Sequence, residues 1–210
     1  MIDFPEKGAV ILIQLFLDQE VLVNILVAGL GLLLFRLCAG VFPKLFTGNW
    51  IFLSLLAVYL CLMYAVTGIP SVRYCVFHPQ INLLPFSDFG EPRFFMLSSL
   101  NILMTVPLGV LLPLCWRQYQ RFPRAMAAGF LTSLTIELSQ MFCFRATDID
   151  DLILNTLGAA LGFFLGKLIF GRFWKTAGSD KQGYLVLSMI LAFLCFFLRQ
   201  ELYDLAAGLW

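Results

Sequence analysis

Most of the side chains that could do chemistry lie in two short stretches, and the first is TSLTIELSQMF, residues 132–142. Glu137 is the only charged residue between Ala125 and Cys143, an apolar segment long enough to cross a membrane as a helix. Ser133, Glu137 and Gln140 follow at i, i+4 and i+7, so they share one helix face. A carboxyl group at membrane depth is costly unless it is paired, neutralised or hydrated. We therefore expect Glu137 to face the interior of a helix bundle, where it does chemistry or clamps helices together by hydrogen bonds.

The second stretch is RATDIDDLILNT, residues 145–156. Thr147 followed by Asp150 has the spacing of a capping box, which predicts a helix start. The helix macrodipole favours acids at such a start and accounts in part for Asp150. Asp151 and Asn155 are four residues apart and share a helix face. Because Asn155 is a full turn deeper, the macrodipole explains it less well.

A tight connection between these two helices is predicted to bring six polar residues to one membrane-embedded corner: Glu137, Gln140, Arg145, Asp148, Asp151 and Asn155. Carboxylates in different environments can divide general acid and general base roles, so Glu137, Asp148 and Asp151 are the candidate catalytic residues. Carboxylate and amide oxygens also suit a hard divalent cation such as Mg²⁺, with no particular metal ligands assigned. His78, the only histidine, stands alone in a loop and gives no metal motif.

Composition indicates which solvent surrounds the elements that position this corner. Of the 210 residues, 60% are hydrophobic and only 13% are charged, and 22 are Phe. Soluble domains carry roughly a quarter charged residues. A chain this short cannot bury so much apolar surface in one aqueous core. The sequence therefore predicts a membrane protein, and it contains no basic stripe that would indicate a nucleic-acid partner.

Apolar runs predict an all-α fold, a polytopic transmembrane bundle of about six helices that forms a single membrane domain over residues 1–210. The expected spans are Val21–Val41, Trp50–Thr67, Leu97–Trp116, Ala125–Cys143, Leu152–Phe170 and Tyr184–Leu198. The connection Gly68–Phe95 is expected to be a surface or re-entrant loop. Gly158, Gly162 and Gly166 form a small-residue stripe of the kind that lets helices pack closely.

The distribution of Lys and Arg predicts the orientation of these spans. With six spans, nine Lys and Arg fall on one side and five on the other. The side richer in Lys and Arg is expected to face the cytoplasm. Both termini and the acidic 144–151 loop are then extracytoplasmic, in a multi-pass protein of the cell membrane.

Several motifs in order resemble the VanZ-like family of bacterial membrane proteins. They are N-L-x-P-F at residues 82–86, NILMTVPLGVLLP at 101–113, IELSQ at 136–140, and R-x-x-D-x-x-D-L-I-x-N-T-x-G-A-x-x-G from Arg145. The resemblance covers about residues 81–166. The family pattern falls on these residues: Asn82, Pro85, Phe86, Asn101, Pro107, Gly109, Glu137, Gln140, Arg145, Asp148, Asp151, Asn155 and Gly158.

The resemblance implies an accessory resistance protein that raises tolerance to teicoplanin, a glycopeptide acting at the outer face of the membrane. Our first hypothesis is a membrane factor that binds or modifies a cell-envelope component through the acidic corner. The second is a membrane enzyme acting on a lipid-linked or phosphorylated substrate, and the third is a small lipid or solute transporter. The expected partners are membrane lipid and either a lipid-linked cell-wall precursor or a glycopeptide. The candidate substrate-binding residues are Asn82, Asn101, Gln140, Arg145 and Asn155.

Overall fold

The computed structural model describes residues 50–68, 70–143 and 145–177, together with 190, 193–194, 197–198 and 201. The expected span Val21–Val41 lies outside the described residues, as does most of Tyr184–Leu198. Four long helices fill the described ranges. They are α3 (Trp50–Thr67), α4 (Phe94–Cys115), α5 (Phe122–Gln140) and α6 (Ile149–Ala177). Helices were predicted at all four places, and α3 has the predicted limits.

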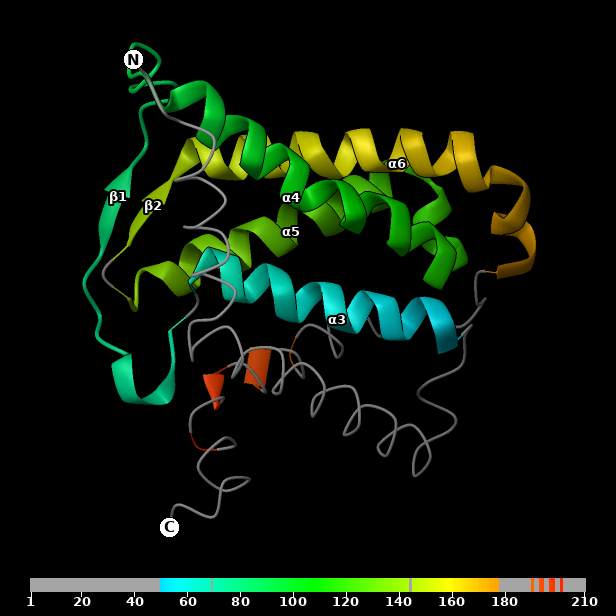
Figure 1. Ribbon diagram of the computed structural model, residues 1–210, viewed down its shortest axis with the longest axis horizontal. Helices are drawn as coiled ribbons and strands as arrows, with labels where there is room; N and C mark the ends of the chain where they lie inside the picture. The colour runs from blue at the N-terminus through cyan, green and yellow to red at the C-terminus, as the bar shows by residue number, and fades with distance from the viewer. Residues whose placement is uncertain are drawn as a thin grey trace, which may run out of the picture.

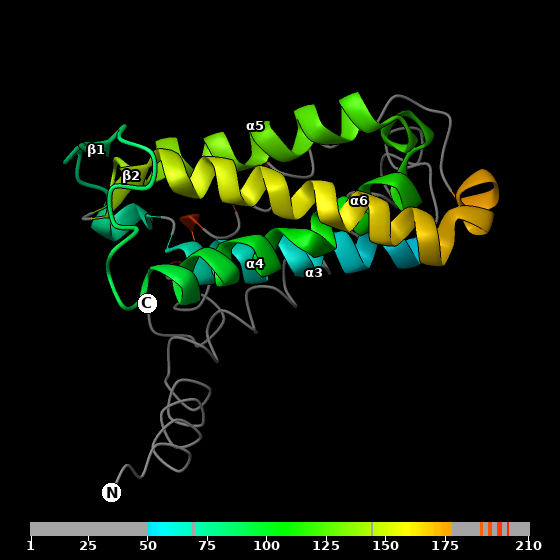
Figure 2. The same cartoon turned by 90° about the horizontal axis from the view of Figure 1, so that it is seen from above.

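The four helices run side by side along the long axis of the molecule (Figures 1 and 2). The most extensive contact is between α4 and α6, with α5 against α6 and α3 against α4. Buried Leu56 and Leu60 of α3 share an apolar core with Leu108 and Leu112 of α4. The helices therefore form one bundle in which α4 has neighbours on two sides.

Among the described helices, two are long and apolar enough to cross a membrane, Phe94–Cys115 and Ile149–Trp174. Helices α3 and α5 were also expected to span. The apolar part of α3, Ile51–Tyr64, is shorter, and α5 is less apolar because its inner face buries Thr132, Ser133 and Glu137. These polar groups face neighbouring helices, where hydrogen bonds can satisfy them. The helical bundle is thus confirmed, while the described residues account for four helices of the six expected.

Glycine makes the contact between α4 and α6 unusually close. A Cβ atom at Gly158 would overlap the carbonyl oxygen of Ile102, and one at Gly162 would overlap that of Val106. From the other side, a Cβ atom at Gly109 would overlap the carbonyl oxygen of Ala159. The predicted small-residue stripe is confirmed as a packing surface, with Gly109 as its counterpart on α4.

The connection from α3 to α4 contains a strand that the sequence did not predict. After the short 3-10 helix η1 (Val72–Tyr74), β1 (Gln80–Asn82) pairs in parallel with β2 (Ala146–Asp148). The register places Asn82 opposite Asp148. This two-stranded sheet lies at one end of the bundle (Figure 1). The all-α expectation is corrected to this extent.

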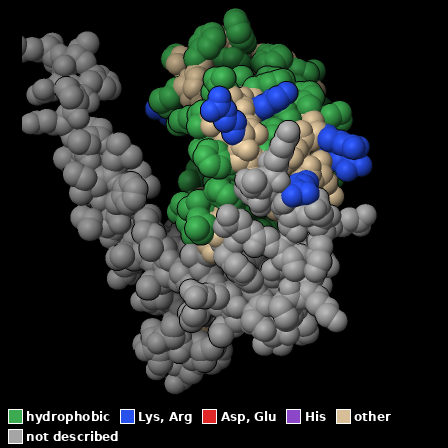
Figure 3. All heavy atoms as spheres, turned by 90° about the vertical axis from the view of Figure 1, so that its right-hand side faces the viewer, with side chains coloured by type: hydrophobic (Ala, Val, Ile, Leu, Met, Phe, Trp, Pro, Cys, Tyr) green, Lys and Arg blue, Asp and Glu red, His purple; other side chains and the backbone are tan. Residues whose placement is uncertain are grey.

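The opposite end of the bundle is basic. There the chain turns from α4 to α5 through the 3-10 helix η2 (Arg117–Gln120), next to Arg121 and Arg124. Seen from this end, Lys and Arg side chains gather on the surface, and no Asp or Glu of the described residues is visible (Figure 3). The two ends of the helices therefore differ in charge.

Candidate functional site

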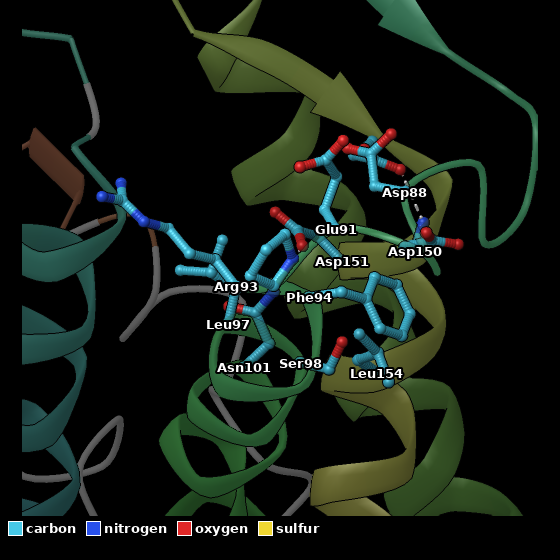
Figure 4. A pocket seen from close by; sticks show the side chains of 12 residues that line it. Asp88, Glu91, Arg93, Phe94, Leu97, Ser98, Asn101, Asp150, Asp151 and Leu154 are labelled. Carbon is cyan, nitrogen blue, oxygen red and sulfur yellow. Dashed lines mark hydrogen bonds between the residues drawn. The ribbon is translucent and has the colours of Figure 1, made fainter.

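A cleft of about 550 Å³ lies at the end of the bundle that carries the sheet. The loop before α4, the first two turns of α4 and the start of α6 form its walls (Figure 4). Its lining residues are Asp88, Glu91, Pro92, Arg93, Phe94, Leu97, Ser98, Asn101, Asp148, Asp150, Asp151 and Leu154. Five of these are carboxylates and one is a cation, so the cleft is strongly acidic.

Pairing of β1 with β2 sets the loop wall of the cleft against α6. Asn82 donates from Nδ2 to Oδ2 of Asp148 at 3.1 Å and to Oγ of Ser87 at 3.0 Å. Its Oδ1 atom accepts the Leu84 N–H at 3.2 Å. Asn82 thus ties both the following loop and Asp148 into place, and it does so from outside the cleft lining.

Asp148 and Asp150 organise the start of α6. Oδ1 of Asp148 accepts the N–H of Asp150 at 2.9 Å, which is the bond of an N-cap residue. The predicted capping box of Thr147 with Asp150 is therefore wrong, because the helix begins one residue later. The Asp150 carboxylate instead accepts the Phe86 N–H, at 2.8 and 3.0 Å from its two oxygens.

The contact with Asp150 fixes an uncommon backbone conformation in the loop. Phe86 has a φ of 57°, in the left-handed region that side chains other than glycine rarely adopt. Asp150 is only 7% exposed, so most of its carboxylate is committed to this contact. The macrodipole explanation was incomplete, since the side chain of Asp150 holds the loop wall of the cleft to α6.

Asp151 lies where α6 meets α4 in the floor of the cleft. Nδ2 of Asn101, on α4, donates a hydrogen bond to its Oδ1. One turn further along α6, Thr105 donates to the carbonyl oxygen of Asn155 at 2.7 Å, just before the glycine contact begins. Asp151 is half-buried and remains part of the cleft lining (Figure 4).

Glu137 lies behind the cleft and does not line it. It is 3% exposed, as expected for a bundle-facing carboxyl group. Its Oε2 atom accepts the N–H of Asp148 at 2.9 Å, and its carbonyl oxygen accepts the Thr147 hydroxyl at 2.9 Å. The side chains of Asn101 and Asn155 donate elsewhere, to Asp151 and to Ser133. Glu137 supports the residue that caps α6.

The remaining candidates bind other parts of the bundle. Gln140 and Arg145 each donate to the Thr67 carbonyl oxygen at 3.0 Å, at the C-terminus of α3. Asn155 donates from Nδ2 to the Ser133 hydroxyl at 3.0 Å and joins α6 to α5. Three of the eight candidate residues, Asn101, Asp148 and Asp151, therefore line the cleft, and the other five do not.

The cleft also contains residues that the sequence reasoning missed. Asp88, Glu91 and Arg93 line it from the loop, and Ser98 does so from α4. Their signal was the run S-D-F-G-E-P-R, a charged stretch directly before an apolar helix. The guanidinium group of Arg93 points away from the carboxylates (Figure 4). Charge within the cleft is therefore poorly balanced.

The acidic lining does not amount to a metal centre. Within the part of the chain that the structure describes, no three or more His, Cys, Asp or Glu side chains form a group that could hold a metal ion. Two of the carboxylates are already hydrogen-bonded to backbone N–H groups. A divalent cation such as Mg²⁺ would need further ligands from whatever else occupies the cleft.

Fold and site together describe a helical bundle with two helices apolar enough to cross a membrane and with an acidic cleft at one end. The family model described as VanZ/LLP1 matches residues 52–170, more than half of the chain, and the chain belongs to this family. A relative is Protein VanZ of Enterococcus faecium, which is 32% identical over 122 residues, covering 54% of this chain and 71% of that protein. No solved structure matches the chain.

Proposed function

We propose that this protein is a multi-pass component of the bacterial cell membrane that binds a cell-envelope component in its acidic cleft and thereby raises tolerance to a glycopeptide such as teicoplanin. Membership of the VanZ/LLP1 family supports the link with resistance. The observation that carries the binding role is the cleft itself, with five carboxylates and one Arg in its lining.

Charge complementarity indicates what the cleft prefers. Unbalanced carboxylates with low-dielectric walls concentrate cations and repel anions. A free amino group of a lipid-linked, peptide-bearing cell-wall precursor, or of the glycopeptide, is the best-matched ligand. A phosphate group would be repelled here unless a divalent cation accompanied it. We therefore favour recognition of the amine-bearing part of such a molecule.

The charge difference between the two ends of the bundle supports an orientation. Arg117, Arg121 and Arg124 lie in the turn from α4 to α5, at the end opposite the cleft. Under the positive-inside rule that end faces the cytoplasm. The cleft would then open outside, where glycopeptides act. Impermeant thiol reagents should label a cysteine introduced at Asp88 in whole cells but not one introduced at Arg121, and the reverse pattern would contradict this orientation.

The binding role is tested by removing charge from the cleft while keeping its shape. Asp151→Asn and Asp148→Asn retain side-chain size and an oxygen acceptor. We expect glycopeptide tolerance to be lost in a Gram-positive host while folded yield and thermal midpoint in detergent are retained. Glu201→Gln is the matched control, because Glu201 pairs with Arg73 outside the cleft. Full tolerance in both cleft variants would remove these carboxylates from the function.

A membrane enzyme is the second candidate, and one observation favours it. Asp151 lines the cleft whereas Glu137 is buried behind it, and such unequal environments allow separate acid and base roles. Mass spectrometry of lipid extracts from expressing cells would show a modified precursor that depends on Asp151 if the protein is an enzyme. A transporter is less favoured, because the cleft lies at one end of the helices rather than at their middle.

A further inference from the structure

The loop that walls the cleft carries large apolar side chains on its outer surface. Leu84 is 72% exposed, Phe89 61% and Phe95 65%. Phe89 and Phe95 contact Phe94 and each other, with ring centroids 5.5 Å apart in each pair. We call this surface, formed by Leu83, Leu84, Phe86, Phe89 and Phe95, the aromatic collar. Contiguous exposed apolar surface of this kind marks an interaction site.

The loop is amphipathic around the cleft. Asp88, Glu91 and Arg93 line the cleft, whereas Leu84 and Phe89 do not. Apart from Pro92, which also lines the cleft, the charged residues of this short loop form an inner, cleft-lining surface and its large apolar residues an outer one. Such separation is typical of segments that lie in the interfacial layer of a membrane.

The aromatic collar continues the outer face of α4. In the first turns of α4, Phe95, Met96, Leu100 and Leu103 are all more than half exposed. Helix α4 has 22 residues and is apolar enough to span, and at 1.5 Å per residue it is about 33 Å long. That length nearly matches a hydrocarbon core of about 30 Å. The first residues of α4, and the collar beside them, therefore fall at the edge of the hydrocarbon.

The floor of the cleft lies deeper in the membrane than the aromatic collar. Asn101, which binds Asp151, lies seven residues after Phe94, so it is about 10 Å along α4 from the start of the helix. Over that distance Met96 and Leu100 are exposed on the outer face of α4, away from the cleft lining. The acidic floor is thus at a depth where lipid surrounds the outside of the helix.

We propose that the aromatic collar is embedded in the interfacial layer of the membrane, with lipid headgroups and upper acyl chains as its partner. The cleft then opens at headgroup level. If the proposed function holds, its ligand is an amphiphile that reaches the cleft from within the membrane. Insertion of the collar itself does not depend on that function, and a physical measurement on the unliganded protein tests it.

Nitroxide accessibility in lipid vesicles distinguishes lipid from water and from protein. The full chain, with its six native cysteines replaced, would carry a spin label at Leu84→Cys or Phe89→Cys in phosphatidylglycerol–phosphatidylethanolamine vesicles. Arg121→Cys provides an aqueous reference and Leu103→Cys a reference within the hydrocarbon, because both residues are exposed. Thermal midpoints confirm that each labelled protein is folded, and either collar site alone decides the test.

We expect oxygen to relax both collar labels more than a water-soluble nickel chelate does, with a depth between those of the two references. Nickel accessibility equal to that at Arg121→Cys would place the collar in water and overturn the proposal. Low accessibility to both reagents would show that protein covers the collar, and this outcome also overturns it. Tolerance to glycopeptide is not measured, so failure here leaves the proposed function standing.

Discussion

Asp150 and Asp151 are neighbours in the sequence, yet the structure uses their carboxylates differently. Asp150 is 7% exposed, and both of its oxygens bind the backbone N–H of Phe86. Asp151 is half-buried, and its hydrogen bond comes from a side chain, Asn101. A carboxylate committed to the backbone holds the fold, whereas one bound to another side chain in the cleft can exchange that partner for a ligand.

The same contrast separates two regions of the polar corner. Behind the cleft, Glu137 binds the Asp148 N–H and Gln140 binds the Thr67 carbonyl oxygen. Along the front, Asp88 and Glu91 are exposed, and neither accepts a bond that fixes α6. The corner thus consists of a supporting region and a presenting region, and residue type alone does not distinguish them. Substitutions should distinguish the two regions through their effects on stability.

The largest loss of stability is expected for Glu137→Ala. It removes the buried acceptor of the Asp148 N–H and leaves a small cavity, which should lower the free energy of unfolding by about 3 kcal/mol. Glu137→Gln retains an oxygen acceptor and should lose clearly less. Thermal denaturation of the purified variants in detergent measures both. If Glu137→Ala were as stable as the parent protein, Glu137 would not belong to the supporting region.

The second largest loss of stability is expected for Asp150→Ala, about 2 kcal/mol in the free energy of unfolding. The Phe86 N–H loses its acceptor, and the left-handed backbone at Phe86 loses the contact that supports it. Amide hydrogen exchange should rise in residues 83–90 and remain unchanged in α5. Asp150→Asn keeps one acceptor oxygen and provides the graded control. Equal exchange throughout the bundle would show that Asp150 supports global folding rather than this loop.

The elements could largely be predicted from the sequence. Helix α3 has its predicted limits because an uncharged apolar run is bounded by Trp50 and Gly68. Gly158 and Gly162, spaced by four on one helix face, predicted a close helix contact, and the structure identifies α4 as the partner. Asp148 and Asp151 were predicted to lie at one corner, and both line the cleft, together with Asn101 from α4, which was not part of the predicted corner. Apolar periodicity and small-residue spacing are local sequence patterns, so they predict helices and their packing faces without knowledge of the tertiary structure.

The supporting contacts could not be predicted, because their partners are distant backbone groups. Asp150 binds an N–H that lies 64 residues away, and Gln140 a carbonyl oxygen 73 residues away. Backbone groups are the same at every residue, so the sequence does not mark which one is used. The three-residue strand at Gln80–Asn82 is too short for an alternating pattern, and its pairing with β2 is equally long-range.

Asn101→Ala should produce a smaller loss of stability, about 1 kcal/mol, since Asp151 can accept water in the cleft in place of the lost amide. Glycopeptide tolerance should nevertheless fall, because Asp151 would no longer be held in one orientation. Ser99→Ala on the same helix is the control, as Ser99 is exposed and bonds only the Phe95 carbonyl oxygen of its own helix. A stability loss as large as that of Glu137→Ala would place Asn101 in the supporting region.

The smallest effect on stability is expected for the double variant Asp88→Asn with Glu91→Gln. Both side chains are exposed, so the free energy of unfolding should change by less than about 0.5 kcal/mol. These two carboxylates contribute to the electrostatic field at the cleft. Salt screens this field over a Debye length of about 8 Å at physiological ionic strength. If the cleft attracts a cationic ligand, glycopeptide tolerance should fall modestly, and less than in Asp151→Asn.

Raising the ionic strength of the medium should reduce the difference between the double variant and the parent protein. A double variant with unchanged tolerance at low ionic strength would confine recognition to Asp148 and Asp151. A loss of stability comparable to that of Asp150→Ala would instead show that the loop acids support the fold, and the division of the corner into two regions would fail.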